Sequence, residues 1–343
     1  MSHFLDIKDL NVQYTSGGEV IHAVNGVSFH LDKGKTLALV GETGAGKTTI
    51  CKTILRILPD RAAKVKGGTV ELDGQELLSL PEAQMRKIRG QKISMVFQDP
   101  MTALNPVMKV GNQIAEAIRL HNDITKREAE ERAKDMMTMV GITPERYNEY
   151  PHQFSGGMKQ RVVIAMALAC TPDLLLADEP TTALDVTIQA QILEMIADLR
   201  KQYNTSMILV THDLGVVANV ADRIAVMYAG DIVELGTCDE VFYDPRHPYT
   251  WALLSSLPQL GTKDEPLYSI QGTPPNLFHE VKGDAFAPRN PKALKIDFVE
   301  RPPFFEVTPT HYARTWLMDP RAPKVEPPEH VRILREKGVN RVG

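Results

Sequence analysis

The chain has 343 residues, 43% of them hydrophobic, and a formal net charge of −4. This composition supports a real hydrophobic core and about two domains, and it supplies no overall basic field that would argue for nucleic acid as a partner. No apolar run approaches the roughly 20 residues of a membrane span, the N-terminus lacks a signal-peptide pattern, and the three cysteines form no CxxC pair. We therefore expect a soluble protein of a reducing compartment, with any membrane role acting through a partner.

The first 40 residues predict short strands. Turn signals stand at residues 16–18 and 32–34. The continuous apolar run at 36–40 is typical of a buried parallel strand.

A complete phosphate-binding loop of the form GxxxxGK[ST] follows that strand. Glycines let successive backbone N–H groups point at one phosphate chain, and the helix predicted after the loop adds its positive N-terminal end. Lys47 is suited to the β- and γ-phosphates and the Thr48 hydroxyl to Mg²⁺. The alternative is a chance glycine-rich turn, which the strand before and the helix after disfavour. The loop is Gly41-Glu42-Thr43-Gly44-Ala45-Gly46-Lys47-Thr48.

The rest of the chain alternates between strand and helix patterns. Residues from about 244 are richer in proline and isolated charges, which predicts a C-terminal extension with little regular structure. Further strands are predicted at 67–73, 91–97, 174–177, 207–210 and 224–227, and helices within 108–140, at 158–170 and at 186–202.

Polar side chains follow three of these predicted strands. Asp178 and Glu179 end an apolar strand, where Asp178 is suited to hold Mg²⁺ and Glu179 to orient or deprotonate a water. Gln98 and His212 each follow another strand and are suited to reach metal, water or the γ-phosphate. Taken alone, the carboxylates could be a solvated loop pair, Gln98 a surface amide and His212 a core or capping residue.

A second glycine-rich element, Ser155-Gly156-Gly157, precedes the predicted helix at 158–170. It offers a hydroxyl and free N–H groups at a helix N-terminus, as an anion site would. One nucleotide does not need two such loops, so we expect this one to serve a nucleotide bound on another subunit.

With this element the chain resembles an ABC-transporter ATPase subunit from residue 4 to about 240. The matching order is an aromatic residue (Tyr14), the phosphate loop, Gln98, the SGG signature, the acidic strand end, Ala183-Leu184-Asp185 and His212. The resemblance implies an α/β fold with a RecA-like parallel-sheet core, an antiparallel β subdomain and a helical subdomain. It implies an ATPase domain at 1–243, with the helical subdomain at about 99–160, and an extension at 244–343.

The resemblance also implies roles for these residues around ATP and Mg²⁺. In the family, two subunits close head to tail around two ATP molecules. Glu179 is then the general base, assisted by Gln98 and His212, and Thr48, Gln98 and Asp178 hold the metal. Phe154 and Met158 replace commoner signature residues, a mild departure that leaves Ser155 in place. The nucleotide-binding set is Tyr14, Gly41, Thr43, Gly44, Ala45, Gly46, Lys47, Thr48, Thr49, Ser155, Gly156, Gly157 and Asp185.

The extension contains the segments 244–250, 253–254, 257–258, 272–275 and 286–289. In these segments, and at residues 158–161, the chain resembles the dipeptide/oligopeptide importer branch, which shares its tail with nickel, glutathione-like and sugar importers. Some branch members carry four cysteines suited to a [4Fe–4S] cluster. The positions that look equivalent hold Asp284, Asn290, Asp297 and Thr315. We therefore expect no iron–sulfur cluster and an extension held by packing of its aromatic residues. A hard-metal site at Asp284, Asp297 and His311 is weaker than the alternative of scattered surface polar groups.

The resemblance implies the partners and the location. These are a second ABC ATPase subunit that is a paralogue, two integral-membrane permeases, and an extracellular solute-binding protein, at the cytoplasmic face of the membrane. The apolar, irregular run 101–106 is a candidate surface for a permease coupling helix, unless its residues are buried in their own domain. A ribosome- or DNA-directed ABC ATPase and a nucleotide sensor that never hydrolyses are the alternatives, and no basic tail or heptad run favours the first.

Overall fold

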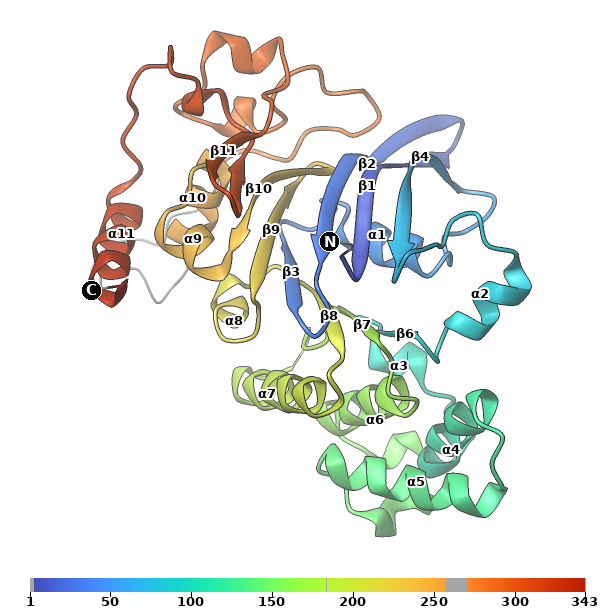
Figure 1. Ribbon diagram of the computed structural model, residues 1–343. Coiled ribbons are helices and arrows are strands. Elements are labelled where there is room, and N and C mark those ends of the chain that lie inside the picture. Colours follow the sequence, from blue (N-terminus) through green and yellow to red (C-terminus); the bar gives the residue numbers. More distant parts are fainter. Residues whose placement is uncertain (1–2, 183, 257–269, 343) are drawn as a thin grey trace. The chain divides into compact units, whose positions relative to one another are not determined.

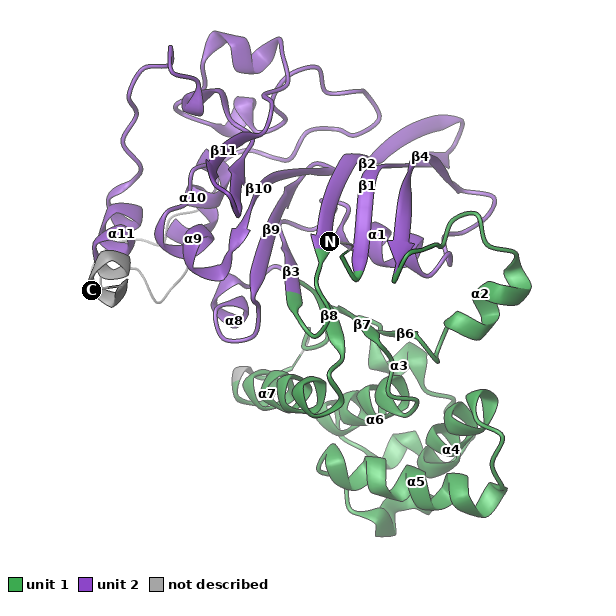
Figure 2. Cartoon of the chain, in the orientation of Figure 1, with its two compact units in different colours: residues 1–4, 31–36, 73–210 green, residues 5–30, 37–72, 211–343 purple. Residues whose placement is uncertain are grey.

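The computed structural model describes residues 3–182, 184–256 and 270–342 (Figure 1). The chain forms two compact units, each assembled from segments that are distant in sequence (Figure 2). Among the described residues, no helix is both long and apolar enough to cross a lipid bilayer. Unit 1 comprises residues 1–4, 31–36 and 73–210, and unit 2 comprises residues 5–30, 37–72 and 211–343.

Unit 2 contains an antiparallel group of strands in the order β2-β1-β4. β1 pairs with β4 so that Tyr14 lies opposite Ala63. The turn between β1 and β2 occurs at Gly17 and Gly18, whose φ angles of 60° and 87° favour glycine. The turn confirms the break predicted at 16–18. The bounds are β1 (Leu5–Ser16), β2 (Glu19–Leu31) and β4 (Ala63–Leu72).

Unit 2 also contains strands in the order β11-β12-β10-β9-β3. β3 runs parallel to β9, and the remaining pairs are antiparallel. All five residues of β3 are buried, as the apolar run predicted. The bounds are β3 (Thr36–Val40), β9 (Arg223–Tyr228), β10 (Asp231–Thr237), β11 (Phe305–Thr308) and β12 (His311–Ala313).

The C-terminal extension shares one hydrophobic core with β9 and β10. Tyr228 of β9, Tyr249 and Phe286 form an aromatic cluster with ring centroids 4.6 to 5.3 Å apart. The prediction of little regular structure was wrong, because short helices and an edge hairpin are interleaved with the proline-rich segments. The helices of unit 2 are α1 (Lys47–Ile54), α8 (Leu214–Val217), α9 (Cys238–Tyr243), α10 (Pro248–Ser255) and α11 (Glu329–Val342).

The polar residues at the positions equivalent to cluster cysteines are buried, so the prediction of scattered surface groups was wrong. The exposed fraction is 7% for Asp284 and 1% for Asp297, and Asn290 and Thr315 are buried with them. Burial raises the pKa of Asp284 to about 7 and also raises that of Asp297. His311 is buried as well, and its Nε2 lies 2.8 Å from a carboxylate oxygen of Glu234. Leu257 and Pro258 lie outside the described residues.

Unit 1 contains three parallel strands in the order β8-β7-β6. Every residue of β7 and β8 is buried, which agrees with the predicted apolar strands. The bounds are β6 (Ile93–Val96), β7 (Leu174–Asp178) and β8 (Ser206–Thr211), and the two-residue β5 (Gln75–Glu76) also lies here.

The helices of unit 1 include the predicted insert as α4 and α5 (Figure 1). Thr125 and Glu128 form a reciprocal capping box at the start of α5, which fixes where that helix begins. Gly111 of α4 lies so close to the Tyr147 ring that a Cβ there would be 2.1 Å from it. The helices are α2 (Glu82–Ile88), α3 (Pro100–Ala103), α4 (Val110–His121), α5 (Lys126–Met139), α6 (Gly156–Leu168) and α7 (Val186–Tyr203).

Short 3₁₀ segments complete the chain. They lie at Pro144–Asn148, Pro151–Gln153, Ala287–Arg289, Lys295–Phe298 and Trp316–Met318. The last three hold the extension together around buried side chains such as Trp316, whose indole N–H donates to Glu300 O at 2.8 Å.

Candidate phosphate site and acidic strand end

The phosphate loop of unit 2 joins β3 to α1 and is packed tightly against its neighbours. A Cβ at Gly41 would be 2.1 Å from Met227 O, and one at Gly46 would be 2.4 Å from Ala23 O. Gly46 also has a φ angle of 98°, which side chains rarely adopt. Two loop positions therefore require glycine because backbone approaches them closely.

Lys47 begins α1 and is 4% exposed. Its Nζ donates to Gly41 O at 2.6 Å and to Glu42 O at 2.9 Å. The ammonium group is thus held on the loop's own carbonyls. A cation buried at the positive N-terminal end of a helix is suited to bind a polyphosphate.

Tyr14 and His212 are the other predicted site residues of unit 2. Tyr14 is half-buried on β1, and its hydroxyl lies 3.3 Å from Oγ1 of Thr49, in the first turn of α1. His212 is exposed and directly follows β8. The structure therefore places the Tyr14 hydroxyl against the helix that follows the phosphate loop.

The acidic strand end belongs to unit 1. Asp178 is 3% exposed at the end of β7, and Glu179 follows it with a φ angle of 45°. A non-glycine residue in this left-handed region is uncommon and marks a constrained position. Glu179 Oε2 accepts hydrogen bonds from Gln98 Nε2 at 3.0 Å and from Thr182 Oγ1 at 2.9 Å.

The structure thus brings Gln98 and Glu179 together, although they are far apart in sequence. Thr182 is a contact that the sequence analysis missed, and its place three residues after Glu179 was the available signal. Because both hydrogen bonds reach Oε2, the second carboxylate oxygen receives neither of them. A carboxylate held in this way can accept a proton from a water.

The SGG element caps α6 in unit 1. Ser155 is the N-cap, and its hydroxyl accepts from Met158 N at 3.4 Å. A Cβ at Gly157 would be 2.9 Å from the Ile188 side chain of α7. Asp185 is exposed at the N-cap of α7 and makes no capping hydrogen bond through its side chain. Ala183, the first residue of the Ala183-Leu184-Asp185 motif, lies outside the described residues.

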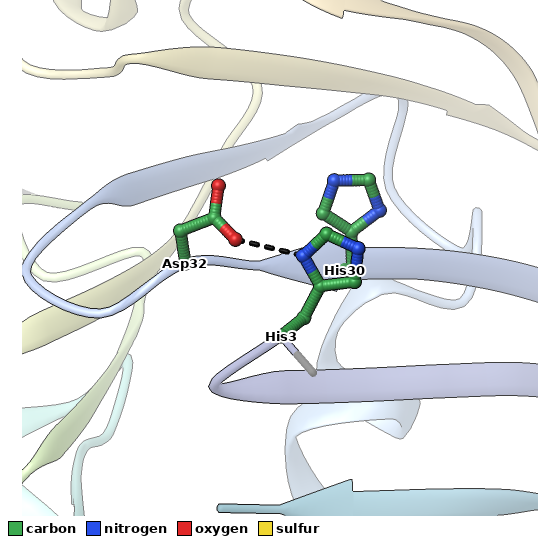
Figure 3. A group of neighbouring side chains, drawn as sticks. All are labelled: His3, His30 and Asp32. Carbon is green, nitrogen blue, oxygen red and sulfur yellow. Dashed lines mark hydrogen bonds and ion pairs between the residues drawn. The ribbon is translucent and has the colours of Figure 1, made fainter. Parts of the chain in front are cut away.

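Unit 1 contains an imidazole–carboxylate pair near its N-terminus, outside the predicted site. His3 Nδ1 lies 2.8 Å from Asp32 Oδ1, and Figure 3 draws this exposed pair together with His30. The His30 ring nitrogen lies 2.7 Å from the Arg223 guanidinium. A guanidinium at the imidazole competes with a cation for the same nitrogen.

Comparisons with known proteins identify two regions of the chain. A family model described as ABC transporter matches residues 24–182, and one described as Oligopeptide/dipeptide transporter, C-terminal region, matches residues 233–296. The chain resembles the dimeric post-hydrolysis structure of the ATP-binding cassette MJ0796 bound to ADP and Pi, with a TM-score of 0.62 and 28% identity. That likeness covers 68% of this chain and 98% of the cassette.

Two relatives match almost the whole chain. The oligopeptide transport ATP-binding protein OppD of Bacillus subtilis is 56% identical over 343 residues, which is 99% of this chain and 96% of that protein. The dipeptide transport ATP-binding protein DppD of Lactococcus lactis subsp. cremoris is 53% identical, over 95% of this chain and 94% of that protein. The chain is therefore an ABC ATPase, and it belongs to the family of ABC transporter ATP-binding proteins that carry the oligopeptide/dipeptide transporter C-terminal region.

Proposed function

We propose that this chain binds ATP with Mg²⁺ and hydrolyses it to drive the import of oligopeptides or dipeptides across a membrane. The observation that carries the proposal is the full-length similarity to oligopeptide and dipeptide transport ATP-binding proteins, which includes the C-terminal region as well as the cassette. The alternative within the same class is another cargo of this branch, such as nickel, a glutathione-like peptide or a sugar.

The phosphate loop of unit 2 is proposed to hold the nucleotide. Lys47 exchanges its two carbonyl contacts for phosphate oxygens, and the buried start of α1 supplies N–H donors. Tyr14 stacks on the adenine. The residues assigned to the nucleotide are Tyr14, Gly41, Thr43, Gly44, Ala45, Gly46, Lys47, Thr48 and Thr49.

Thr48, Gln98 and Asp178 are proposed to hold Mg²⁺, which when bound neutralises charge on the β- and γ-phosphates. A hydroxyl, an amide and a carboxylate are hard oxygen donors, and they fit that ion. Glu179 acts as the general base toward the attacking water, while Gln98 holds its carboxylate at 3.0 Å. His212 contacts the γ-phosphate and orients the same water.

Ser155, Gly156, Gly157 and Asp185 are proposed to act on the nucleotide of a second ABC ATPase subunit. The support is the free side chain of Asp185 and the capped N-terminus of α6, whose donors are suited to an anion. A head-to-tail pair that closes on ATP and opens after hydrolysis would transmit that change to the permeases. We propose a paralogue as the second subunit.

The further partners are two integral-membrane permeases and an extracellular solute-binding protein, with this chain at the cytoplasmic face of the membrane. The candidate coupling surface includes α3, none of whose residues is buried. Met101 is 61% exposed and Val107 is 82% exposed, whereas Leu104 is buried. Exposed apolar side chains beside Gln98 support docking of a permease segment there.

The test is purification of the tagged chain from native membranes in mild detergent, followed by mass spectrometry. We expect two multi-spanning permeases and a second ATPase to co-purify, and a co-purifying binding protein would identify the cargo class. Recovery with ribosomes, or alone in every detergent, would contradict the transport proposal. A nucleotide sensor would instead tolerate Glu179→Gln without loss of function.

A further inference from the structure

The C-terminal extension holds the second residue of the phosphate loop, Glu42, at two points. The Arg289 guanidinium donates to both carboxylate oxygens of Glu42, from Nη1 at 2.7 Å and from Nη2 at 3.1 Å. The backbone N–H of Glu42 donates to the hydroxyl of Tyr249 at 2.9 Å. Arg289 and Tyr249 are far from the loop in sequence, and all three residues lie in unit 2.

Arg289 is itself fixed in place. Its side chain is only 5% exposed, whereas that of Glu42 is 27% exposed. The guanidinium also donates to Gln271 O at 2.9 Å and to the Tyr228 hydroxyl at 3.1 Å. A planar, bidentate contact of this kind orients a carboxylate more strictly than a point charge does. The contact is therefore a built feature rather than a chance surface ion pair.

Glu42 in turn touches the residue proposed to bind phosphate. Lys47 Nζ donates to Glu42 O at 2.9 Å, and Ala45 N donates to the same oxygen at 3.2 Å. The backbone of Glu42 is thus held by Tyr249 on one side and by Lys47 on the other. A shift of Glu42 would move the carbonyl on which the ammonium group rests.

The extension also lies against the outer side of the loop. A cavity of about 140 Å³ is lined by loop residues 42–45 together with Tyr228, Ala229, Pro274, Pro275 and Leu277. The extension therefore borders the loop at Pro274, Pro275 and Leu277, in addition to its contacts with Glu42.

We propose that Arg289 and Tyr249 are positioning residues of the nucleotide site, through which the C-terminal extension sets the affinity of the phosphate loop for ATP. The proposal rests on the proposed nucleotide-binding function, and both residues act through Glu42. A loop that is held in its binding shape before the nucleotide arrives binds more tightly. The competing explanation is that the contact only anchors the extension, which would change stability and leave nucleotide affinity unaltered.

The test measures ATP affinity in the presence of Mg²⁺, by displacement of a fluorescent ATP analogue, for the full chain and its variants. Arg289→Ala removes both carboxylate contacts, and Arg289→Lys keeps the charge without the bidentate geometry. Tyr249→Phe removes only the hydroxyl that accepts from Glu42 N–H. Melting temperature is recorded for each variant, and affinity is measured where every variant is folded.

Arg301→Ala is the matched control. Arg301 also joins the extension to the rest of unit 2, since it donates to Asn25 O at 2.8 Å and pairs with Asp231 at 2.6 Å. Within the part of the chain that the structure describes, Arg301 forms no hydrogen bond or ion pair with the loop residues 41–48. A general loosening of the extension would therefore affect Arg301→Ala and Arg289→Ala alike.

We expect Arg289→Ala and Tyr249→Phe each to weaken ATP binding by roughly tenfold, within the range typical of coupled sites. Arg289→Lys is expected to restore part of the affinity, and Arg301→Ala to bind as the parent does. A double-mutant cycle with Glu42→Gln should be non-additive for affinity, because Arg289 acts through Glu42. In the assembled ATPase the KM for ATP should rise more than kcat falls.

The proposal would be overturned if Arg289→Ala and Tyr249→Phe bound ATP as tightly as the parent does. It would also be overturned if Arg301→Ala lost as much ATP affinity as Arg289→Ala. If Arg289→Ala does not fold, Arg289→Lys and Tyr249→Phe decide the question by the same criterion. Lys47→Ala in the same assay distinguishes a failure of this proposal from a failure of the proposed nucleotide-binding function. If the parent binds no ATP, or Lys47→Ala binds it equally well, the proposed function itself fails.

Discussion

Asp284→Asn is expected to make unit 2 more stable at alkaline pH. Asp284 Oδ1 accepts from the Phe286 N–H at 2.9 Å, whereas Oδ2 is buried and has no hydrogen-bond partner. The nearest cationic candidate is His247 Nε2 at 3.8 Å, but burial lowers the pKa of His247 to about 3 and keeps it neutral. Ionised Asp284 therefore carries an uncompensated buried charge.

The direction of this pH dependence follows from the raised pKa of Asp284. Burial, with a contribution from Asp297, raises the Asp284 pKa from 3.8 to about 7, so the folded protein holds this proton more tightly than the unfolded chain. Stability linked to the proton is complete below the unfolded value and is lost as the pH rises through the folded value. A shift of about three units corresponds to an upper limit of ~4 kcal/mol at 1.36 kcal/mol per unit. Asparagine keeps the Oδ1 acceptor and removes the charge.

The assay is urea unfolding followed by tryptophan fluorescence over a pH series. Both tryptophans, Trp251 and Trp316, are buried in unit 2, so the signal reports that unit. We expect the free-energy difference between Asp284→Asn and the parent to grow in favour of the variant by about 2–4 kcal/mol from about pH 4 to about pH 8. A free-energy difference that does not change with pH would show that ionisation of Asp284 does not destabilise unit 2.

Asp319→Asn serves as a control of opposite sign. Hydrogen bonds and charge from Arg321 lower the pKa of Asp319 to about 2, so its ionised form is the favoured one. That substitution is expected to give no gain in stability as the pH rises.

Three further predictions concern the nucleotide site and the coupling surface. Lys47→Ala should abolish ATP binding, because it removes the charge matched to the β- and γ-phosphates; unchanged affinity in a binding assay would reject the loop assignment. Tyr14→Ala should weaken ATP binding by about 1–3 kcal/mol, because stacking on the adenine is lost. Tyr14→Phe keeps the ring and should bind ATP as the parent does. Inorganic tripolyphosphate has no base, so the parent and both variants should bind it equally well. Met101→Asp, at a side chain that is 61% exposed, should leave ATP binding intact but reduce co-purification of the permeases, and undiminished recovery would exclude this surface.

Much of the cassette could be predicted because its signals are local. The phosphate loop is contiguous in sequence, and the glycines at 41 and 46 are needed where backbone approaches within van der Waals distance. The buried strands β3, β7 and β8 are continuous apolar runs, which sequence reasoning detects well. Gln98 and Glu179 were each predicted to follow a strand, but the hydrogen bond between them is visible only in the structure.

The extension was harder to predict because its structure depends on distant contacts. Polar residues are usually exposed, so Asp284 and Asp297 were expected at the surface, yet the folded extension encloses them. β12 is three residues long and is held between β10 and β11, strands that lie far apart in sequence. The contact between Arg289 and Glu42 spans 247 residues, and neither residue type signals the other in sequence.

Glu179→Gln tests whether this chain hydrolyses ATP with Glu179 as the general base. The glutamine is nearly isosteric and keeps an oxygen for the Gln98 and Thr182 contacts, so ATP binding should survive. Glu149→Gln is the matched control, because Glu149 pairs with Arg146 at 2.7 Å and belongs to the same unit.

The measurement is ATP turnover by the complex purified from membranes, with bound nucleotide quantified in the same sample. We expect Glu179→Gln to retain ATP and to lower turnover by about 10²–10⁴-fold, whereas Glu149→Gln keeps the parent rate. Near-normal turnover by Glu179→Gln would contradict the account, because another group would then be activating the water.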